Sequence, residues 1–598
     1  MIRASPFAPG LPPGISFKAL TTTPWGKALD PFCRVRREYL KPCHPTAYSS
    51  KSISHRPTSV TITSLLIPAA MSSIKSKQGA DTSNLDDGVG EFHVEQAFKS
   101  PDVKVGPGQL SSGYESLSLW QTVKVFKVAT AYCFAAAFSA ATDGYQIGIN
   151  GSIIANKGFV HQFATATNAD GDQYLTAPIL AGWSSIMSVG QIIGILTIPF
   201  LSDRYGRKTA MWTYWTILVS SVLCETLART WPVWLAAKLL AGVGVGCLQS
   251  TLPVYISECA PTRIRGGLLM CYSLWWTIGS FFAYIALQLL NRKNPNIWLT
   301  PIYTQWAQIG IMCIIYVFLP ESPAWCVSRG NADRAKKQLL RLNRGVVEYD
   351  EEHQYQIIVQ TFEHEREIAV EQKKEHWYAI FRGIDGFRTV ISLWPNLTQQ
   401  FIGLTLFATF GTYFFQQAGL ADPFTIKCIT SSINITTLLI VVLVADKIGR
   451  RRISCYATTL SWTYCVVIGI LGLVPRTTVT SNIFVLFVCL WNVGMISNGA
   501  AGWGFIAEIS SLRLRPYTAG FGAACTCVAG VVMNVLTPYM VNANKWNWGF
   551  KTGWFYACVG LPFLIGTWLL LPDTSGRTAA EVDELFERKI KPWRFSKT

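Results

Sequence analysis

The chain has 598 residues, 50% of them hydrophobic and only 15% charged, and its formal net charge is +17. Ordinary soluble domains carry about 25% charged residues, so this composition excludes a chain built mainly of soluble domains. A charge this positive could indicate a nucleic-acid partner, but the basic residues gather in alternate loops between apolar segments. Such a distribution orients a membrane protein with its basic loops in the cytoplasm, and we expect no nucleic-acid partner.

The amino-terminal region, residues 1–120, is rich in Ser, Pro, Thr and Gly and has little periodicity, which is typical of a disordered tail. The basic residues near its start also fit a mitochondrial transit peptide, although the prolines interrupt a continuous amphipathic helix. Met71 begins a more ordinary polar stretch. The sequence therefore leaves open whether residues 1–70 belong to the mature protein.

Twelve apolar segments follow, each roughly as long as the 20 residues that cross the hydrocarbon core of a bilayer. They lie near 125–149, 177–201, 209–228, 231–254, 267–290, 299–319, 391–416, 426–445, 454–474, 482–507, 517–541 and 553–571. We predict an all-α membrane protein whose surroundings are a lipid bilayer.

The segments divide into two groups of six. Residues 121–319 are expected to form an amino-terminal bundle and residues 391–571 a carboxy-terminal bundle. Between them, residues 320–390 form a charged cytoplasmic linker, in which 332–342 and 349–374 are expected to be amphipathic helices. Residues 572–598 are a cytoplasmic carboxy-terminal tail, so both termini are predicted to lie in the cytoplasm.

A charged signature occurs once in each group. The first copy is DRYGRK at 203–208, and the second is DKIGRRR at 446–452. Each copy has further companions in the same order: a glutamate, then an arginine, and finally a Pro-acid pair that closes the group. This order indicates a duplicated membrane unit, and the centre between two similar halves is where transporters bind their substrate.

We expect the two signatures to form ion-pair clusters at the cytoplasmic ends of the helices. Gly206 and Gly449 permit the tight turns, and the arginines that follow present planar, permanently charged groups. Ion pairs between the two halves could form only while the cytoplasmic side is closed, so they would act as a latch. The predicted gate residues are Asp203, Arg207, Glu258, Arg265, Asp446, Arg450, Glu508 and Arg515. The alternative is that these charges only orient the chain in the membrane.

Taken together, the motifs resemble those of the sugar porter family of the major facilitator superfamily, in its fungal type, over roughly residues 125–590. The residues that carry the resemblance are Lys238 with the glycines of 242–246, the segment from Pro253 to Gly266, PESP at 320–323, Gln399-Gln400 with Gly403, Trp503 with Glu508 and Arg515, and PDTSG at 572–576. The resemblance implies two pseudo-symmetric six-helix bundles, each of inverted three-helix repeats. It also implies alternating-access transport of a hexose, a disaccharide or glycoside, or a polyol across the plasma membrane.

The resemblance places the sugar against the seventh and tenth helices. Gln399 and Gln400 offer amide donors and acceptors for hydroxyl groups, and Trp503 offers a flat apolar face for a sugar ring. The predicted substrate-binding residues are Gln399, Gln400, Thr405, Trp503, Ser273 and Asn498. Interhelical hydrogen bonding is the structural alternative for the glutamines, and membrane packing is the alternative for the tryptophan.

Three positions depart from the family pattern in the same direction. Thr405, Ser273 and Thr526 carry short hydroxyl side chains where an amide is usual in the family. Shorter side chains leave more room and offer fewer hydrogen bonds. The departures therefore favour a substrate that is larger or less polar than free glucose.

The first predicted helix bears on the energy source. Proton-coupled members of the family have an acid where this chain has Gln146, which does not titrate. Asp143 lies about one helical turn earlier, and an ionisable residue inside a membrane helix is a functional candidate. Two hypotheses remain: a facilitator that follows the sugar gradient, which we favour slightly, or a proton symporter in which Asp143 is the proton site.

Other functions are less well supported by the sequence. A nutrient sensor of the same fold would need a long signalling tail, and a carrier of organic acids would need a cation inside the bundle, where only Lys238 stands out. No CxxC pair, Cys/His set at zinc spacing or nucleophile–base pair is found, so we expect no enzyme, no metal and no cofactor apart from possible coupling to H+. The expected partners are a small sugar or polyol and the bilayer, and the chain is expected to be a monomer.

Overall fold

The computed structural model describes residues 113–114, 117–167, 171, 173–346, 349–374, 377–420, 422–475, 477–510, 514–542, 544–574 and 579–597. All of them lie in the second of the chain's two compact units, Gly90–Thr598. The tail predicted to be disordered lies almost wholly outside the described residues. Residues 1–70, whose place in the mature protein the sequence leaves open, also lie outside them.

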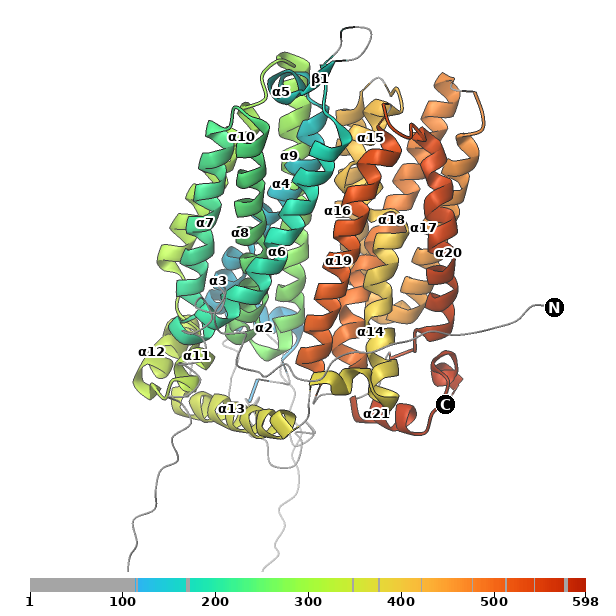
Figure 1. Ribbon diagram of the computed structural model, residues 1–598. Coiled ribbons are helices and arrows are strands. Elements are labelled where there is room, and N and C mark those ends of the chain that lie inside the picture. The colour runs from blue at the N-terminus through green and yellow to red at the C-terminus, as the bar shows by residue number, and fades with distance from the viewer. Residues whose placement is uncertain are drawn as a thin grey trace, which may run out of the picture. The chain divides into compact units, whose positions relative to one another are not determined.

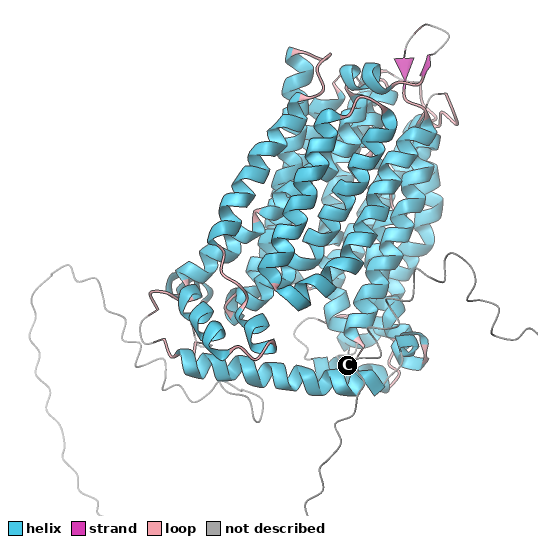
Figure 2. Ribbon diagram, turned by 60° about the vertical axis from the view of Figure 1, so that its left-hand side comes forward, coloured by secondary structure: helices cyan, strands magenta, loops and turns pink. Residues whose placement is uncertain are grey.

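The described chain is almost entirely helical (Figures 1 and 2). The amino-terminal half consists of α2 (Leu119–Val125), α3 (Lys127–Ala137), α4 (Ser139–Ser152), η2 (Ile153–Ala155), α5 (Lys157–Phe163), the short hairpin β1 (Ala166–Thr167) and β2 (Gln173–Tyr174), α6 (Ala177–Tyr205), α7 (Arg207–Leu227), α8 (Trp231–Cys259), η3 (Thr262–Ile264), α9 (Arg265–Lys293) and α10 (Thr300–Phe318).

The carboxy-terminal half consists of α14 (Gly383–Phe401), the π-helical turn η5 (Thr405–Thr409), α15 (Gly411–Gln417), α16 (Pro423–Ile448), α17 (Arg450–Leu471), α18 (Thr478–Ile509), α19 (Arg515–Val541), η6 (Gly549–Lys551) and α20 (Thr552–Leu570). The linker holds α11 (Pro323–Ser328), α12 (Ala332–Leu342), α13 (Glu351–Lys374) and η4 (Trp377–Phe381), and the tail holds α21 (Ala579–Glu587) and η7 (Pro592–Lys597).

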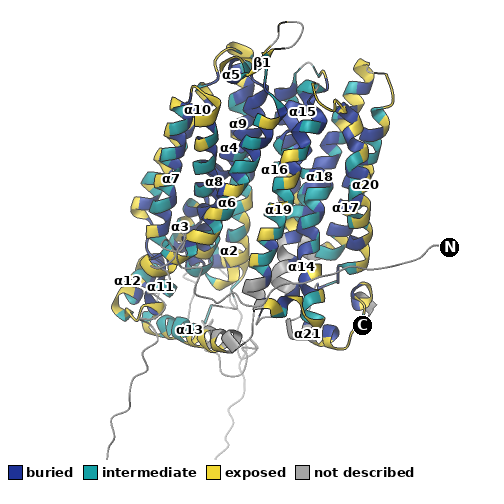
Figure 3. Cartoon of the chain, in the orientation of Figure 1, coloured by how far each residue is buried: buried dark blue, intermediate teal, exposed yellow. Residues whose placement is uncertain are grey.

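Each of the twelve predicted apolar segments is helical. Among the described residues, nine helices are long and apolar enough to cross a membrane, and the bent pair of α2 with α3–α4 makes a tenth. The other two predicted segments are α7, which begins with the charged end of the signature, and the interrupted chain of α14, η5 and α15. Large apolar side chains such as Ile314 on α10 and Ile565 on α20 remain exposed, which suits a lipid-facing surface. Figure 3 shows exposed residues along the outer helices, among them α7 and α10.

The turn glycines of the signatures behave as expected. Gly206 separates α6 from α7 with φ of 107°, and Gly449 separates α16 from α17 with φ of 90°. Side chains with a Cβ avoid this region of backbone conformation, so a helix can end and restart within one residue at these positions.

The glycine run of α8 is a packing surface. A Cβ added at Gly242 would lie 2.2 Å from the carbonyl oxygen of Met187, and one added at Gly246 would lie 2.2 Å from that of Gln191. Both carbonyls belong to α6, so the glycines let two helix backbones touch, as small residues do in membrane bundles.

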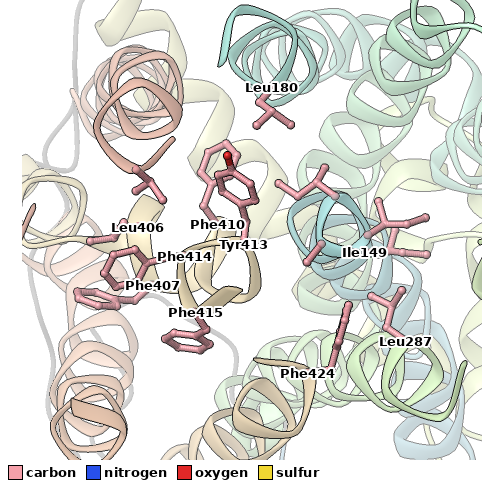
Figure 4. Packing of buried hydrophobic residues seen from close by; sticks show 14 of the residues in the cluster. Ile149, Leu180, Leu287, Leu406, Phe407, Phe410, Tyr413, Phe414, Phe415 and Phe424 are labelled. Atoms are coloured by element: carbon pink, nitrogen blue, oxygen red, sulfur yellow. The ribbon is translucent and has the colours of Figure 1, made fainter. Parts of the chain in front are cut away.

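The molecule has a linker end, where α11, α12 and α13 lie, and an opposite end, where α5 and α15 lie (Figure 1). At the opposite end the two halves are in close contact. The Thr412 hydroxyl of α15 donates to Ser152 of α4 at 2.8 Å, and Asn542 after α19 donates to the carbonyl of Leu175 at 3.3 Å. One apolar cluster crosses between the halves, and Figure 4 shows Ile149 and Leu180 of one beside Phe410 and Tyr413 of the other.

The linker and the tail pack on the linker end. Helix α12 spans the predicted residues 332–342, and α13 crosses beneath the bundle (Figure 2). Helix α14 starts at Gly383, before residue 391, because Arg388 and Thr389 are buried against the bundle rather than solvated. In the tail, Phe586 and Phe595 join an apolar cluster with Ile391.

Candidate functional site

The seventh predicted membrane segment is interrupted at its middle. Helix α14 ends at Phe401, Gly403 adopts φ of +103°, and a π-helical turn precedes α15. Non-helical backbone at membrane depth occurs where it is buried in protein or lines a cavity, because its polar groups need partners. The predicted motif residues Gln399, Gln400 and Thr405 stand on either side of this break.

Three amide side chains of α14 face glycine surfaces on neighbouring helices. A Cβ added at Gly502 of α18 would lie 2.9 Å from Oδ1 of Asn396, and one added at Gly530 of α19 would lie 3.7 Å from Nε2 of Gln400. Both polar atoms of Asn396 and Nε2 of Gln399 are buried and have no hydrogen-bond partner among the described residues. Buried polar atoms almost always have partners in folded proteins, so these amides mark a place where a ligand hydroxyl can bind.

The structure places the other predicted substrate residues as follows. Thr405 is buried at the first residue of η5, and Ser273 is exposed on α9. The side chain of Trp503 lies outside the described part. Oδ1 of Asn498 accepts a 2.6 Å hydrogen bond from Ser454 of α17, so this amide links two helices of the same half, which favours a packing role.

Asp143 lies fully buried on α4 among polar side chains of its own half. Its Oδ2 accepts hydrogen bonds from Gln249 of α8 at 3.1 Å and from the Tyr272 hydroxyl of α9 at 3.0 Å. Its Oδ1 is buried without a partner among the described residues. The predicted proton site is therefore a carboxyl that has polar neighbours on two other helices.

A buried ion pair lies beside Gln146, the position discussed for proton coupling. Lys238 of α8 and Glu225 of α7 are both fully buried, with Nζ and Oε1 3.0 Å apart. Gln305 of α10 donates to the other oxygen of Glu225 at 3.2 Å and accepts from Gln146 of α4 at 2.6 Å. Lys238 also lies over the Trp234 ring at 4.6 Å. Four helices thus share one polar network in which the lysine already has a carboxylate partner.

The first signature forms a compact charged cluster at the linker end. Arg207 pairs with Asp203 at 2.8 Å and with Glu258 at 2.8 Å, and Glu321 accepts from the backbone N–H of Arg207 at 2.9 Å. Arg265 is exposed at the start of α9 and forms no ion pair with the described side chains.

In this structure the cluster lies within one half, so the latch between the two halves stays a prediction for the state in which the linker end is closed. Asp203, Arg207 and Glu258 belong to α6, α7 and α8, all of the amino-terminal half. The turn at Gly206 folds Arg207 back between the ends of its own neighbours, so its guanidinium is satisfied within one half. In the second signature, the side chains of Asp446, Glu508 and Arg515 lie outside the described part, and Arg450 is partly buried at the start of α17.

A profile of the family described as "Sugar (and other) transporter" matches residues 132–586 of the chain. The chain belongs to this family. Members carry solutes across membranes and are not enzymes, so the prediction of a sugar porter rather than an enzyme is confirmed by the family.

Relatives of the transporter include several fungal proteins. It is 26% identical to the general alpha-glucoside permease of Saccharomyces cerevisiae over 82% of its own length and 80% of the relative's. It is 28% identical to the MFS transporter fmqE of Aspergillus fumigatus, over 76% and 85% of the two chains. The low-affinity glucose transporter HXT1 of S. cerevisiae is 24% identical, over 79% and 84%.

Solved structures show the fold of the transporter. The proton:xylose symporter XylE bound to 6-bromo-6-deoxy-D-glucose is 20% identical, with a TM-score of 0.59 over 76% of this chain and 99% of that one. The inward open conformation of XylE from E. coli is 19% identical, with the same TM-score over 78% and 99%. The predicted major facilitator fold is therefore confirmed.

Three polar residues of the transporter were not predicted from the sequence as functional candidates and are buried in the structure: Asn396, Glu225 and Lys427. All three lie inside or at the start of a predicted apolar segment, and a buried polar or ionisable side chain there is a functional candidate by default. Lys427 in particular corrects the expectation that Lys238 alone stands out. It stands in the second turn of α16 and is only 5% exposed.

Proposed function

We propose that the protein is an alternating-access transporter of a sugar, either a hexose, a glycoside such as a disaccharide, or a polyol. Its place is the plasma membrane, with the termini, α11–α13 and the linker end in the cytoplasm. The relatives whose names state a sugar substrate support the class, and the excess of basic residues in alternate loops supports the orientation.

The unpartnered amides of α14 carry the proposal. Asn396 and Gln399 hold buried donors and acceptors whose hydrogen-bonding capacity is unused, beside a break in the helix. A hydroxyl-rich ring satisfies such groups, whereas an apolar solute would leave them unpaired at a cost of about 1–3 kcal/mol each. Gln400 and Thr405 extend the same surface, and Trp503 is proposed as the flat apolar face.

We favour facilitated transport over proton symport. The charge of Lys238 is balanced by Glu225 within the network. Gln146 carries a neutral amide at the position where proton-coupled members of the family have an acid. This site therefore needs no proton to neutralise it. Asp143 remains the one proposed proton site, because its Oδ1 is buried without a partner among the described residues.

The substrate class and the coupling are tested together in a host that lacks its own sugar carriers. Growth is scored on monosaccharides, α-glucosides and polyols, and uptake of each radiolabelled sugar is then measured. We expect uptake of at least one sugar with no alkalinisation of an unbuffered medium. Alkalinisation that disappears in Asp143→Asn would overturn facilitation, and growth on none of the panel would overturn the sugar assignment.

Deleting residues 1–110, which lie outside the described part, distinguishes a sensor from a transporter. A transporter is expected to keep its sugar uptake without this tail. A non-sugar solute would leave the panel without growth while a different labelled compound accumulated.

A further inference from the structure

Lys427 is a buried cation whose hydrogen bonds go to backbone. Its ammonium donates to the carbonyl of Phe407 at 2.8 Å and to that of Ala408 at 2.9 Å. Both carbonyls belong to η5, the π-helical turn that follows the break at Gly403. Burying a charge is costly unless hydrogen bonds compensate for it, so this contact is a specific one.

The break explains why a cation suits this position. Where a helix ends, its last carbonyls have no intrahelical donor and carry partial negative charge. At η5 the ammonium meets two such carbonyls within one turn of Thr405, and Gly411 leaves room for it, since a Cβ there would lie 2.9 Å from Nζ. Lys427 therefore fixes the conformation of the segment that joins α14 to α15.

The same lysine also contacts the other half of the molecule. Its Nζ lies 5.1 Å from the centre of the Tyr284 ring of α9, within the range of a cation–π contact. Tyr284, Gln288 and Arg292 are spaced by four residues and so lie along one face of α9. This face meets the start of α16 at two more points. Gln288 donates to Asp422 at 3.3 Å and to Thr425, and Arg292 lies 3.8 Å from Asp422.

We propose that Lys427 is a positioning residue for transport. It holds the broken segment beside the sugar amides and, through Tyr284, ties that segment to α9, so that the substrate site and closure of the opposite end change together. The inference rests on the proposed function only in that one of its two measurements uses sugar uptake.

The first measurement needs no substrate. Ser152 is fully buried between the halves at the opposite end, so a cysteine placed there reacts with an impermeant maleimide only when that end opens. Labelling of Ser152→Cys, corrected for the parent without this cysteine, is compared in Lys427→Met, Lys427→Arg and Tyr284→Leu. Lys545→Met is the matched control, because Lys545 is an exposed lysine at the same end.

We expect labelling to rise several-fold in Lys427→Met and in Tyr284→Leu, and to stay near the parental level in Lys427→Arg and Lys545→Met. Arginine can still donate to both carbonyls and stack on the ring. In the second measurement, the KM for uptake of radiolabelled maltose or glucose is expected to rise about tenfold in Lys427→Met with little change in maximal rate per molecule at the surface.

Unchanged labelling and unchanged KM in folded Lys427→Met would overturn the inference. If that variant does not fold, Tyr284→Leu decides, because it leaves the carbonyl bonds intact, and parental labelling there would overturn the link to α9. If the protein takes up neither maltose nor glucose, the KM is measured with a transported compound of the growth panel. If none of the panel is transported, the sugar assignment fails, but the labelling result does not depend on it.

Discussion

Asn396 and Asn498 are two buried asparagines with opposite surroundings. Asn498 has a hydrogen-bond partner in Ser454, whereas both polar atoms of Asn396 have none among the described residues. The contrast separates a packing amide from a binding amide. Because a partnered amide contributes to stability and an unpartnered one does not, their replacement has different consequences.

The first prediction follows from this contrast. Asn396→Leu is expected to raise the KM for the transported sugar roughly tenfold while leaving the melting temperature in detergent unchanged or higher, because no internal hydrogen bond is lost. Asn498→Leu is the matched control. It is expected to lose about 1–3 kcal/mol of stability with a normal KM for the protein that reaches the membrane. A stability loss in Asn396→Leu alone would contradict the prediction.

The second prediction concerns the buried pair of Glu225 and Lys238. Removing only the carboxylate leaves an uncompensated buried ammonium, so Glu225→Gln is expected to destabilise the protein by about 3–5 kcal/mol. The double variant Glu225→Gln with Lys238→Met is expected to recover most of this loss, because neither buried charge of the pair then remains. Thermal unfolding of the single and double variants forms a double-mutant cycle. Additive losses would show that the pair does not act as one unit.

At the scale of elements, the interruption between α14 and α15 is the feature that places the site. The glycine of the seventh-helix motif stands at the break, where φ of +103° excludes ordinary side chains. The motif thus combines the amides that face the sugar with the residue that unwinds the helix after them.

Gly403→Ala tests the break directly. An alanine in this conformation is strained by roughly 1–2 kcal/mol, and its Cβ would lie 3.2 Å from the Phe407 ring. We expect a lower melting temperature and sugar uptake reduced by more than half. Gly310→Ala is the control, since this glycine lies within α10, has no atom within 4 Å of an added Cβ, and should gain helix stability. Equal behaviour of the two variants would contradict a role for the break.

The positions of the helices could be predicted from the sequence, but their contacts could not. Apolar length and turn glycines were enough for the twelve segments, and α12 has the expected bounds. The break at Gly403 has no periodic signal, because the apolar run continues through it. The sequence did predict Glu258 as the partner of Arg207. Whether such an ion pair lies within one half or between the two halves depends on which helix ends are neighbours, and the spacing of residues in the sequence does not determine this.

At the scale of the whole molecule, the two ends differ in the ion pairs and hydrogen bonds that the described residues form between the halves. The Arg207 cluster at the linker end lies within one half and can stay intact in both conformations. At the opposite end, α9 and α16 are joined across the halves by the contacts of Asp422 with Gln288 and Arg292. The contacts that must break when the opposite end opens therefore include those of Asp422 and Lys427 with α9, besides the hydrogen bonds that Thr412 and Asn542 make with the other half.

The last prediction is a pH dependence of that opening. Partial burial tends to raise the pKa of Asp422, but hydrogen bonds from Thr425 and Gln288 and the charge of Arg292 outweigh it, so the pKa lies below its ordinary value. In the open state the α9 partners Gln288 and Arg292 are lost, whereas Thr425 lies on α16 and keeps its hydrogen bonds, so the pKa rises part of the way toward about 3.9. Because the pKa of Asp422 is lower in the closed state, its carboxylate stabilises the closed state fully at pH values above the open-state pKa. This stabilisation decreases as the pH falls and is lost once the pH is below the closed-state pKa. The thiolate is the form that reacts, so labelling of Ser152→Cys is divided at each pH by the rate at which free cysteine reacts with the same maleimide. The corrected labelling is expected to be constant from about pH 7 to 5 and to rise below about pH 4. In Asp422→Asn the rise should vanish and labelling should be higher at neutral pH, and a rise between pH 7 and 5 in the parent would point to another titrating group.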